Sequence, residues 1–161
     1  MTRIGRIGSA ASMALSVCLV VVVSAAWVAP SHSGTKRMFK DETYQELQGY
    51  AAIDRLVAVV RCEAIETLQP GSRSERQQIR ATVLAGPATL AAGSAVLLAR
   101  FAQGKPLMDV GKTYLVAAYR ESTSGPLALV EHRAVDPAAA ASDYEAARAD
   151  LSARLDGLKP R

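Results

Sequence analysis

Residues 56–65 (LVAVVRCEAI) decide the fold class of this chain, because β-branched and other apolar side chains dominate them. In an extended chain, successive side chains point to opposite faces. Leu56 and Val60 then share one face, while Arg61 and Glu63 lie on the other. An apolar face opposite a partly charged one is typical of a β-strand that covers a core. We therefore expect a strand here, with partner strands further along the chain.

Four further stretches have the strand pattern, at residues 78–84, 95–102, 113–120 and 127–135. In the first of them, Ile79, Ala81 and Val83 alternate with polar residues. A polar loop at residues 69–77 (QPGSRSERQ) and later Gly- and Pro-containing turns separate the strands. Five short strands divided by turns predict a mainly β domain, either a small barrel or a sandwich.

Helices are expected on both sides of the strands. Residues 43–48 predict a short helix, with Thr43 and Glu46 at capping-box spacing. The C-terminal helix begins either at Asp136-Pro137, with the aspartate as N-cap, or at Ser142, in a second capping box. Asp150 and Arg154 are spaced for an ion pair within that helix. Its apolar stripe, which serves either packing or the binding of a partner or membrane, comprises Tyr144, Ala147, Leu151, Leu155 and Leu158.

The strand order resembles a known family. Residues 52–65, 79–86, 93–99 and 107–120 follow one another as in the OB-like barrel of the tissue inhibitors of metalloproteinases, the netrin C-terminal modules and their bacterial relatives. The best-matching motif is GKTYLV at 111–116. The resemblance covers about residues 44–135 and implies a five-stranded OB-like barrel, here with a short N-terminal helix and a C-terminal amphipathic helix.

The chain departs from that family in its cysteines. The inhibitors use a disulfide-bonded N-terminal cysteine to chelate the zinc of their target. Here Cys18 lies in an apolar run and Cys62 is alone in the β domain, so the family's bridges are missing. Metalloproteinase inhibition by that mechanism is therefore not expected. An apolar neighbourhood favours a buried, inert Cys62 over a reactive one.

The N-terminus has the parts of an export signal. Arg3 and Arg6 precede an uncharged apolar run at residues 13–29. As a helix this run spans about 26 Å, slightly less than the roughly 30 Å core of a bilayer. A cleaved signal peptide, an uncleaved membrane anchor and a buried core helix remain open. We expect an exported protein, periplasmic or secreted, that is anchored if the segment is retained.

These boundaries divide the chain into four parts. They are a signal peptide or anchor at 1–31, a linker at 32–42, the OB-like β domain at 43–135 and the C-terminal helix at 136–161. Without the first part, the formal net charge falls from +4 to +2, because two arginines and no acids are lost. Such a mildly basic domain is unlike a dedicated nucleic-acid binder, which carries a dense basic face.

Catalytic, cofactor and metal motifs are not expected. With His32 in the linker and His132 on a strand, the sequence has no His-x-x-x-His or Cys-x-x-Cys spacing. The stretch 109–113 (DVGKT) ends like a phosphate loop, but it precedes a strand rather than a helix. His132 is interpreted as an exposed or edge-packed strand residue. The chain is therefore expected to be no enzyme and to need no cofactor.

The function that best fits these observations is a non-enzymatic binding module for another envelope or extracellular protein, through a barrel groove and the loop at 69–77. The alternative is electrostatic binding of an anionic glycan, lipid or nucleic-acid surface. Tyr114, Tyr119 and Phe101 are candidate stacking platforms for it. Strand arginines are more often part of a solvated outer face that discourages edge pairing. The candidate anion or partner contacts are Arg61, Arg80, Arg100 and Arg120.

Overall fold

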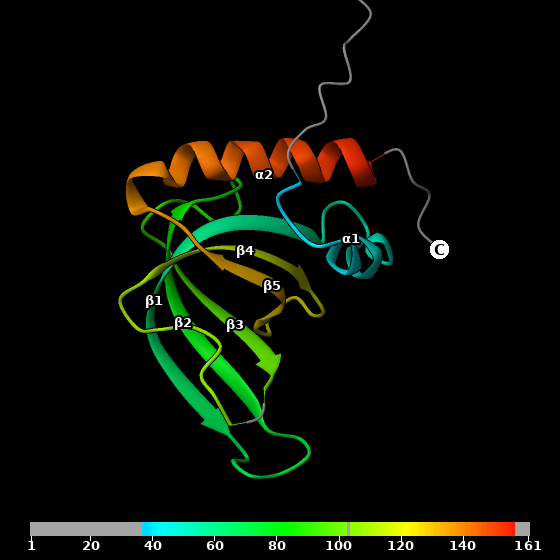
Figure 1. The fold of residues 1–161 in the computed structure, drawn as a ribbon. Helices are drawn as coiled ribbons and strands as arrows, with labels where there is room; N and C mark the ends of the chain where they lie inside the picture. The colour runs from blue at the N-terminus through cyan, green and yellow to red at the C-terminus, as the bar shows by residue number, and fades with distance from the viewer. Residues whose placement is uncertain (1–36, 103, 157–161) are drawn as a thin grey trace, which may run out of the picture. The chain divides into compact units, whose positions relative to one another are not determined.

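The computed structural model describes residues 37–102 and 104–156 (Figure 1). The predicted signal or anchor segment at 1–31 and the start of the predicted linker lie outside these residues. In chain order, the elements are α1 (Asp41–Gln48), β1 (Arg55–Leu68), β2 (Arg76–Ala85), β3 (Ala95–Phe101), β4 (Thr113–Arg120), β5 (Leu127–Ala134), the 3₁₀ turn η1 (Pro137–Ala139) and α2 (Ala140–Leu155).

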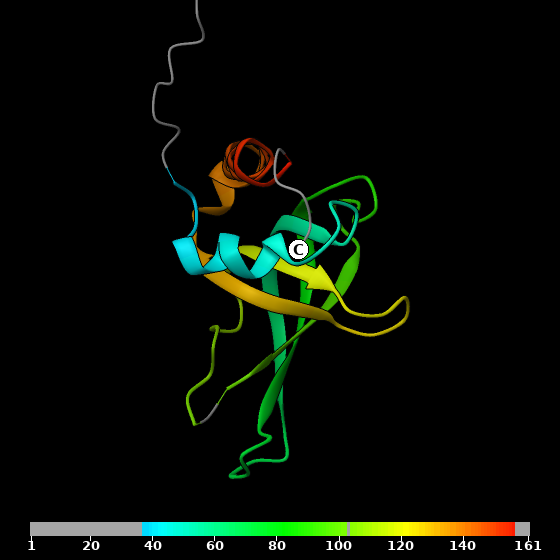
Figure 2. The same ribbon diagram turned by 90° about the vertical axis from the view of Figure 1, so that its right-hand side faces the viewer.

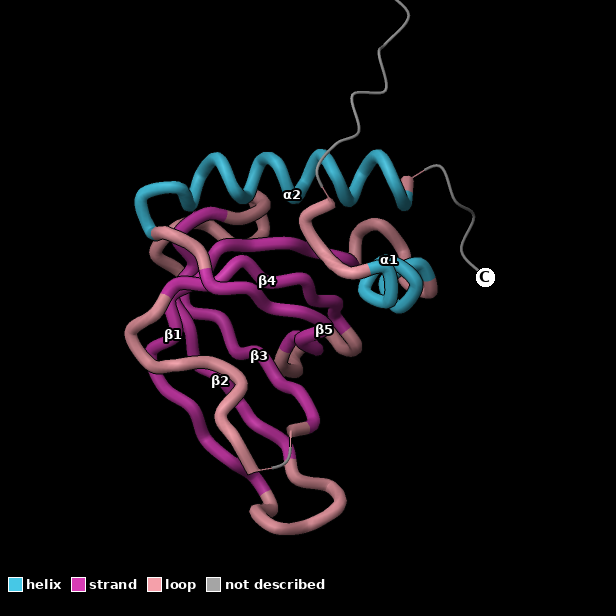
Figure 3. Tube along the Cα trace, viewed as in Figure 1, coloured by secondary structure: helices cyan, strands magenta, loops and turns pink. Residues whose placement is uncertain are grey.

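The five strands form a closed barrel in the order β1-β2-β3-β5-β4. Neighbouring strands are antiparallel, except that β3 and β5 run parallel and pair only through Leu98–Leu127 and Ala99–Ala128. This mainly β architecture with one short and one C-terminal helix was predicted from the sequence, and the strand order is consistent with an OB-like barrel. Figure 3 shows how the strands surround a common interior.

β1 takes part in two pairings. Its residues 55–61 pair with β4, whereas residues 59–68 pair with β2. Register shifts between Val59 and Val60 and between Cys62 and Ala64 mark β-bulges. Bulges bend a strand and increase its twist, which lets one 14-residue strand serve both neighbours. The ends of β1 and β2 that extend past this bend lie far from the helices (Figures 1 and 2).

Two apolar clusters hold the fold together, one inside the barrel and one between the barrel and the helices. Ile79, Ala81 and Val83 point into the barrel, as their alternation predicted. Val57 and Val59 face outward, against α1 and α2. β4 contributes to both clusters, so seven of its eight residues are buried. A strand covered on both faces is apolar throughout, which explains the run TYLVAA at its start.

The start of α1 differs from the prediction. The helix begins at Asp41 after the N-cap Lys40, and no side chain caps it. Thr43 does not form the expected capping box, because its hydroxyl donates a 2.5 Å hydrogen bond to Glu131 of β5. Met38 and Phe39, in the segment predicted as linker, are buried in the second cluster. Packing against a strand distant in sequence therefore replaces the local cap.

The C-terminal helix begins at the first of its two predicted sites. The Asp136 carboxylate accepts a 2.9 Å hydrogen bond from the amide of Ala138. The turn η1 then continues directly into α2, so the alternative start at Ser142 is wrong. Within residues 37–102 and 104–156, no helix is long and apolar enough to cross a membrane.

A buried carboxylate fastens the N-terminal segment to α2. Asp150, 1% exposed, accepts hydrogen bonds from the amide of Met38 at 2.9 Å, the Tyr44 hydroxyl and Arg154 Nε at 2.6 Å. Burial raises the pKa of Asp150, but the hydrogen bonds from Tyr44, Met38 and Arg154 outweigh it and hold the pKa below its usual range. The predicted Asp150–Arg154 pair thus forms, between a buried carboxylate and a guanidinium that is 30% exposed.

Candidate functional site

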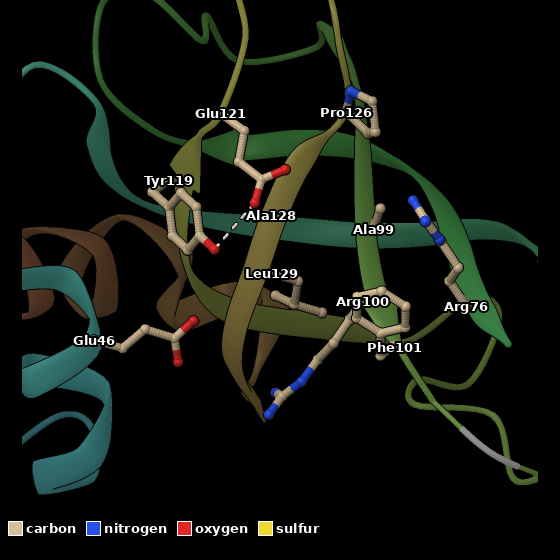
Figure 4. A pocket seen from close by; sticks show the side chains of 10 residues that line it. All are labelled: Glu46, Arg76, Ala99, Arg100, Phe101, Tyr119, Glu121, Pro126, Ala128 and Leu129. Carbon is tan, nitrogen blue, oxygen red and sulfur yellow. Dashed lines mark hydrogen bonds between the residues drawn. The ribbon is translucent and has the colours of Figure 1, made fainter. Parts of the chain in front are cut away.

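A groove of about 410 Å³ lies on the outside of the barrel. Residues of α1, β2, β3, β4 and β5 and of the loop between β4 and β5 contribute to it (Figure 4). In an OB-fold, the face of strands 2 and 3 and the loops beside it form the usual binding surface. The lining residues are Glu46, Arg76, Ala99, Arg100, Phe101, Tyr119, Glu121, Pro126, Ala128 and Leu129.

An exposed aromatic ring forms one side of the groove. Phe101 is 65% exposed, although it is a large apolar residue at the end of β3. Its partner across the β2–β3 ladder is Arg76, whose guanidinium carbon lies 5.0 Å from the centre of the Phe101 ring. This cation–π contact orients the ring while leaving it accessible. Aromatic side chains that combine rigidity with exposure are typical of binding surfaces.

A second aromatic group closes the opposite side. The rings of Tyr119 and Tyr50 stack at 3.7 Å between centres. The Tyr119 hydroxyl donates a 3.3 Å hydrogen bond to Glu121. Burial raises the pKa of Tyr119 far above its usual range, and the hydrogen bond with Tyr50 adds to this effect. Tyr119 is therefore a neutral hydrogen-bonding group at any physiological pH.

The floor of the groove crosses the weakest seam of the barrel. The ladder between β3 and β5 ends after the pair Ala99–Ala128. Beyond that pair, Arg100 of β3 donates a hydrogen bond from its guanidinium to the backbone carbonyl of Val130 in β5. A side chain thus bridges the two strands where backbone pairing stops.

Charges of both signs surround this floor. Arg76 lies on β2, and the Arg100 guanidinium extends from β3 to β5, whereas Glu46 of α1 and Glu121 lie on the side of Tyr119 (Figure 4). A site that contains charges of both signs favours a ligand that also carries both. It differs in this respect from the uniformly basic groove that polyanions require.

The loop between β1 and β2 is held in shape beside the groove. The buried carboxylate of Glu75 accepts hydrogen bonds from the amides of Gly71 at 2.7 Å and Gly104 at 3.0 Å. These bonds lower the pKa of Glu75. Through Glu75, which directly precedes Arg76 in the chain, these bonds connect the β1–β2 loop to the β3–β4 loop. Fixing a loop before binding reduces the entropy that binding costs.

The four predicted arginine contacts do not gather in one pocket. Arg100 lines the groove, whereas Arg80 lines a separate pocket with Ala64 and Leu97 on the outer face of β1–β3. Arg61 is exposed and forms a 2.9 Å ion pair with Glu63. Arg120 is half-buried at the end of β4. Their roles in binding remain predictions.

The sequence did not single out Arg76, although it lies in the predicted binding loop at 69–77, and it gave no indication of Glu46. Phe101 and Tyr119 were candidate stacking residues, and both line the groove, but Tyr114 is buried in the barrel. Arg76 meets Phe101 only through the β2–β3 register, for which the sequence has no signal beyond the position of Arg76 at the end of a loop.

Cys62 lies inside the barrel, whereas His132 of β5 is half-buried instead of exposed. The His132 ring lies edge-on to Tyr114 at 5.8 Å, and its buried Nδ1 has no hydrogen-bond partner among the residues that the structure describes. Burial lowers the pKa of His132 and raises that of the Cys62 thiol. The predicted burial of Cys62 is confirmed. In the described part of the chain, no three His, Cys, Asp or Glu side chains are grouped as metal ligands.

The fold and the groove together define a small five-stranded β-barrel protein with an open, mixed-charge surface groove. No family model and no curated protein matches the chain. The resemblance to the tissue inhibitor and netrin barrels therefore remains a prediction at the level of the family.

Proposed function

We propose that this protein is an exported, non-enzymatic binding module that recognises another envelope or extracellular protein through the groove between α1 and the β2–β3 hairpin. The observation that carries the proposal is the exposed Phe101, held by Arg76 at the edge of a groove with charges of both signs. Protein interfaces concentrate their binding energy in such aromatic and arginine side chains.

Two further features support a protein partner. The Glu75 carboxylate preorganises the neighbouring loop through Gly71 and Gly104, which favours specific recognition. Glu46 and Glu121 would repel a polyanion from the same groove. Electrostatic binding of an anionic glycan, lipid or nucleic acid is therefore the weaker proposal, and it would use the dispersed arginines instead.

Site-specific photo-cross-linking in the producing cells tests the proposal. The full chain carries a photoreactive phenylalanine analogue at position 101, or at position 110 as a matched control. Val110 is 61% exposed, close to the value for Phe101, but it does not line the groove. We expect one discrete protein adduct from position 101 and none from position 110.

A second set of cross-linking experiments reverses the charge at Arg76. Arg76→Glu should abolish the adduct from position 101, whereas Arg80→Glu, on another surface, should leave it. Equal adducts from both probe positions would contradict a specific groove. Adducts with polyanions alone, lost at high salt, would favour the electrostatic alternative.

A further inference from the structure

A second pocket, of about 230 Å³, lies beneath α2 and apart from the groove. The helix passes over the start of β1 there (Figure 1). Leu56, Pro87 and Leu151 provide apolar walls, and the Tyr144 ring lines the same space. Arg55, Arg148 and Asp156 also line the pocket, so two cations and one carboxylate lie beside its apolar walls.

Arg55 is the unusual member of this pocket. Its side chain is only 7% exposed, yet the structure gives its guanidinium one partner among the described residues, Asp156 Oδ1 at 3.6 Å. That distance is too long for a hydrogen bond. A guanidinium has five N–H donors. Among the described residues, no Arg55 nitrogen is both fully buried and without a hydrogen-bond partner, so solvent in the pocket reaches the donors that do not bond to the protein. An anion inside the pocket would replace this solvent and pair with the guanidinium.

The surroundings restrict the kind of anion. Arg148 also lines the pocket, but it is 63% exposed and already paired with Glu145, which leaves Arg55 as the main cation for an anion to bind. Asp156 remains close to Arg55, and it would repel a doubly charged group more than a singly charged one. The apolar walls favour a ligand with a hydrocarbon body.

We propose that the pocket beneath α2 binds a small organic monocarboxylate, whose carboxylate is paired with Arg55 and whose short aliphatic body lies against Leu56 and Leu151. Arg55 then forms the bidentate contact that a guanidinium makes with a carboxylate. This site is independent of the groove and of the protein partner proposed for it.

Titration of the full chain with hexanoate, followed by NMR shifts of the backbone amides, tests the site. We expect saturable shifts at residues 52–57 and 151–156. Affinity should fall about fourfold for each methylene removed between hexanoate and acetate, because burial of each methylene contributes a constant free energy. Hexanol, which lacks the charge, and inorganic phosphate, which lacks the aliphatic body, should bind more weakly than hexanoate.

Two substitutions should move the affinity in opposite directions. Arg55→Gln should weaken hexanoate binding about tenfold or more, as expected for a lost charge-assisted hydrogen bond. Asp156→Asn should strengthen it, because it removes the competing anion at 3.6 Å. The control Arg80→Gln, which changes an arginine outside this pocket, should have no effect.

Four results of these measurements would overturn the proposal. Unchanged binding by the Arg55→Gln variant, weaker binding by the Asp156→Asn variant, or equal affinity for acetate and hexanoate would overturn the proposal. Tighter binding of phosphate than of hexanoate would also overturn it. Because the Asp156→Asn variant is expected to gain affinity, a folding defect in Arg55→Gln cannot account for the full set of expected results.

Discussion

Replacing Asp150 with alanine should destabilise the protein more than any surface substitution. The change removes an acceptor that is 1% exposed and leaves two buried donors, the amide of Met38 and the hydroxyl of Tyr44, without it. Each buried donor left unsatisfied costs about 1–3 kcal/mol. Arg154 is 30% exposed and regains water in part. We expect a loss of about 3–5 kcal/mol, as for other broken buried pairs.

Urea unfolding of the full chain, followed by circular dichroism, measures this loss as a fall in the midpoint at constant slope. Glu145→Ala is the matched control, since it removes another carboxylate of α2 that pairs with an arginine, but on the exposed face. That control should change stability little. A loss below about 1 kcal/mol for Asp150→Ala would refute the idea that Asp150 fastens the N-terminal segment to α2.

The pH dependence of stability gives an independent check. The pKa of Asp150 is lower in the folded protein than its usual value, so the unfolded state takes up the proton first. The stabilisation is complete above the usual carboxylate pKa of about 4 and is lost as the pH falls through the folded value. Asp150→Asn should remove this part of the acid dependence. An unchanged acid profile would show that other carboxylates cause it.

Three further predictions concern the cap, the loop and the barrel interior. Asp136→Ala should cost about 1 kcal/mol in urea unfolding, because the amide of Ala138 loses its cap. Glu75→Ala should speed hydrogen exchange at the amides of Gly71 and Gly104, and unchanged exchange would contradict their dependence on Glu75. His132 should titrate below its usual pKa by NMR, because burial disfavours its charged form. Its contribution to stability is therefore present above about pH 6.5 and lost as the pH falls through the lower folded value.

The predictions that held depend on local pattern. The alternation of Ile79, Ala81 and Val83 identified the face of β2 that points into the barrel. The pair Asp136-Pro137 located the start of the C-terminal helical segment. The alternation of buried and exposed side chains along a strand, and the capping of a helix, both depend on residues only a few positions apart. The sequence alone therefore contains the information that predicts them.

The groove depends on contacts between residues distant in the chain. Arg76 meets Phe101 because β2 and β3 adopt one register, and a shift of one residue would turn every side chain to the opposite face. Local spacing also indicated a cap for Thr43, but the hydroxyl bonds to Glu131 of β5 instead. The sequence by itself therefore determined the five strands, the inner face of β2 and the C-terminal helix. Only the tertiary structure decided which polar residues meet, because the order and register of the strands determine which side chains lie within contact distance of one another.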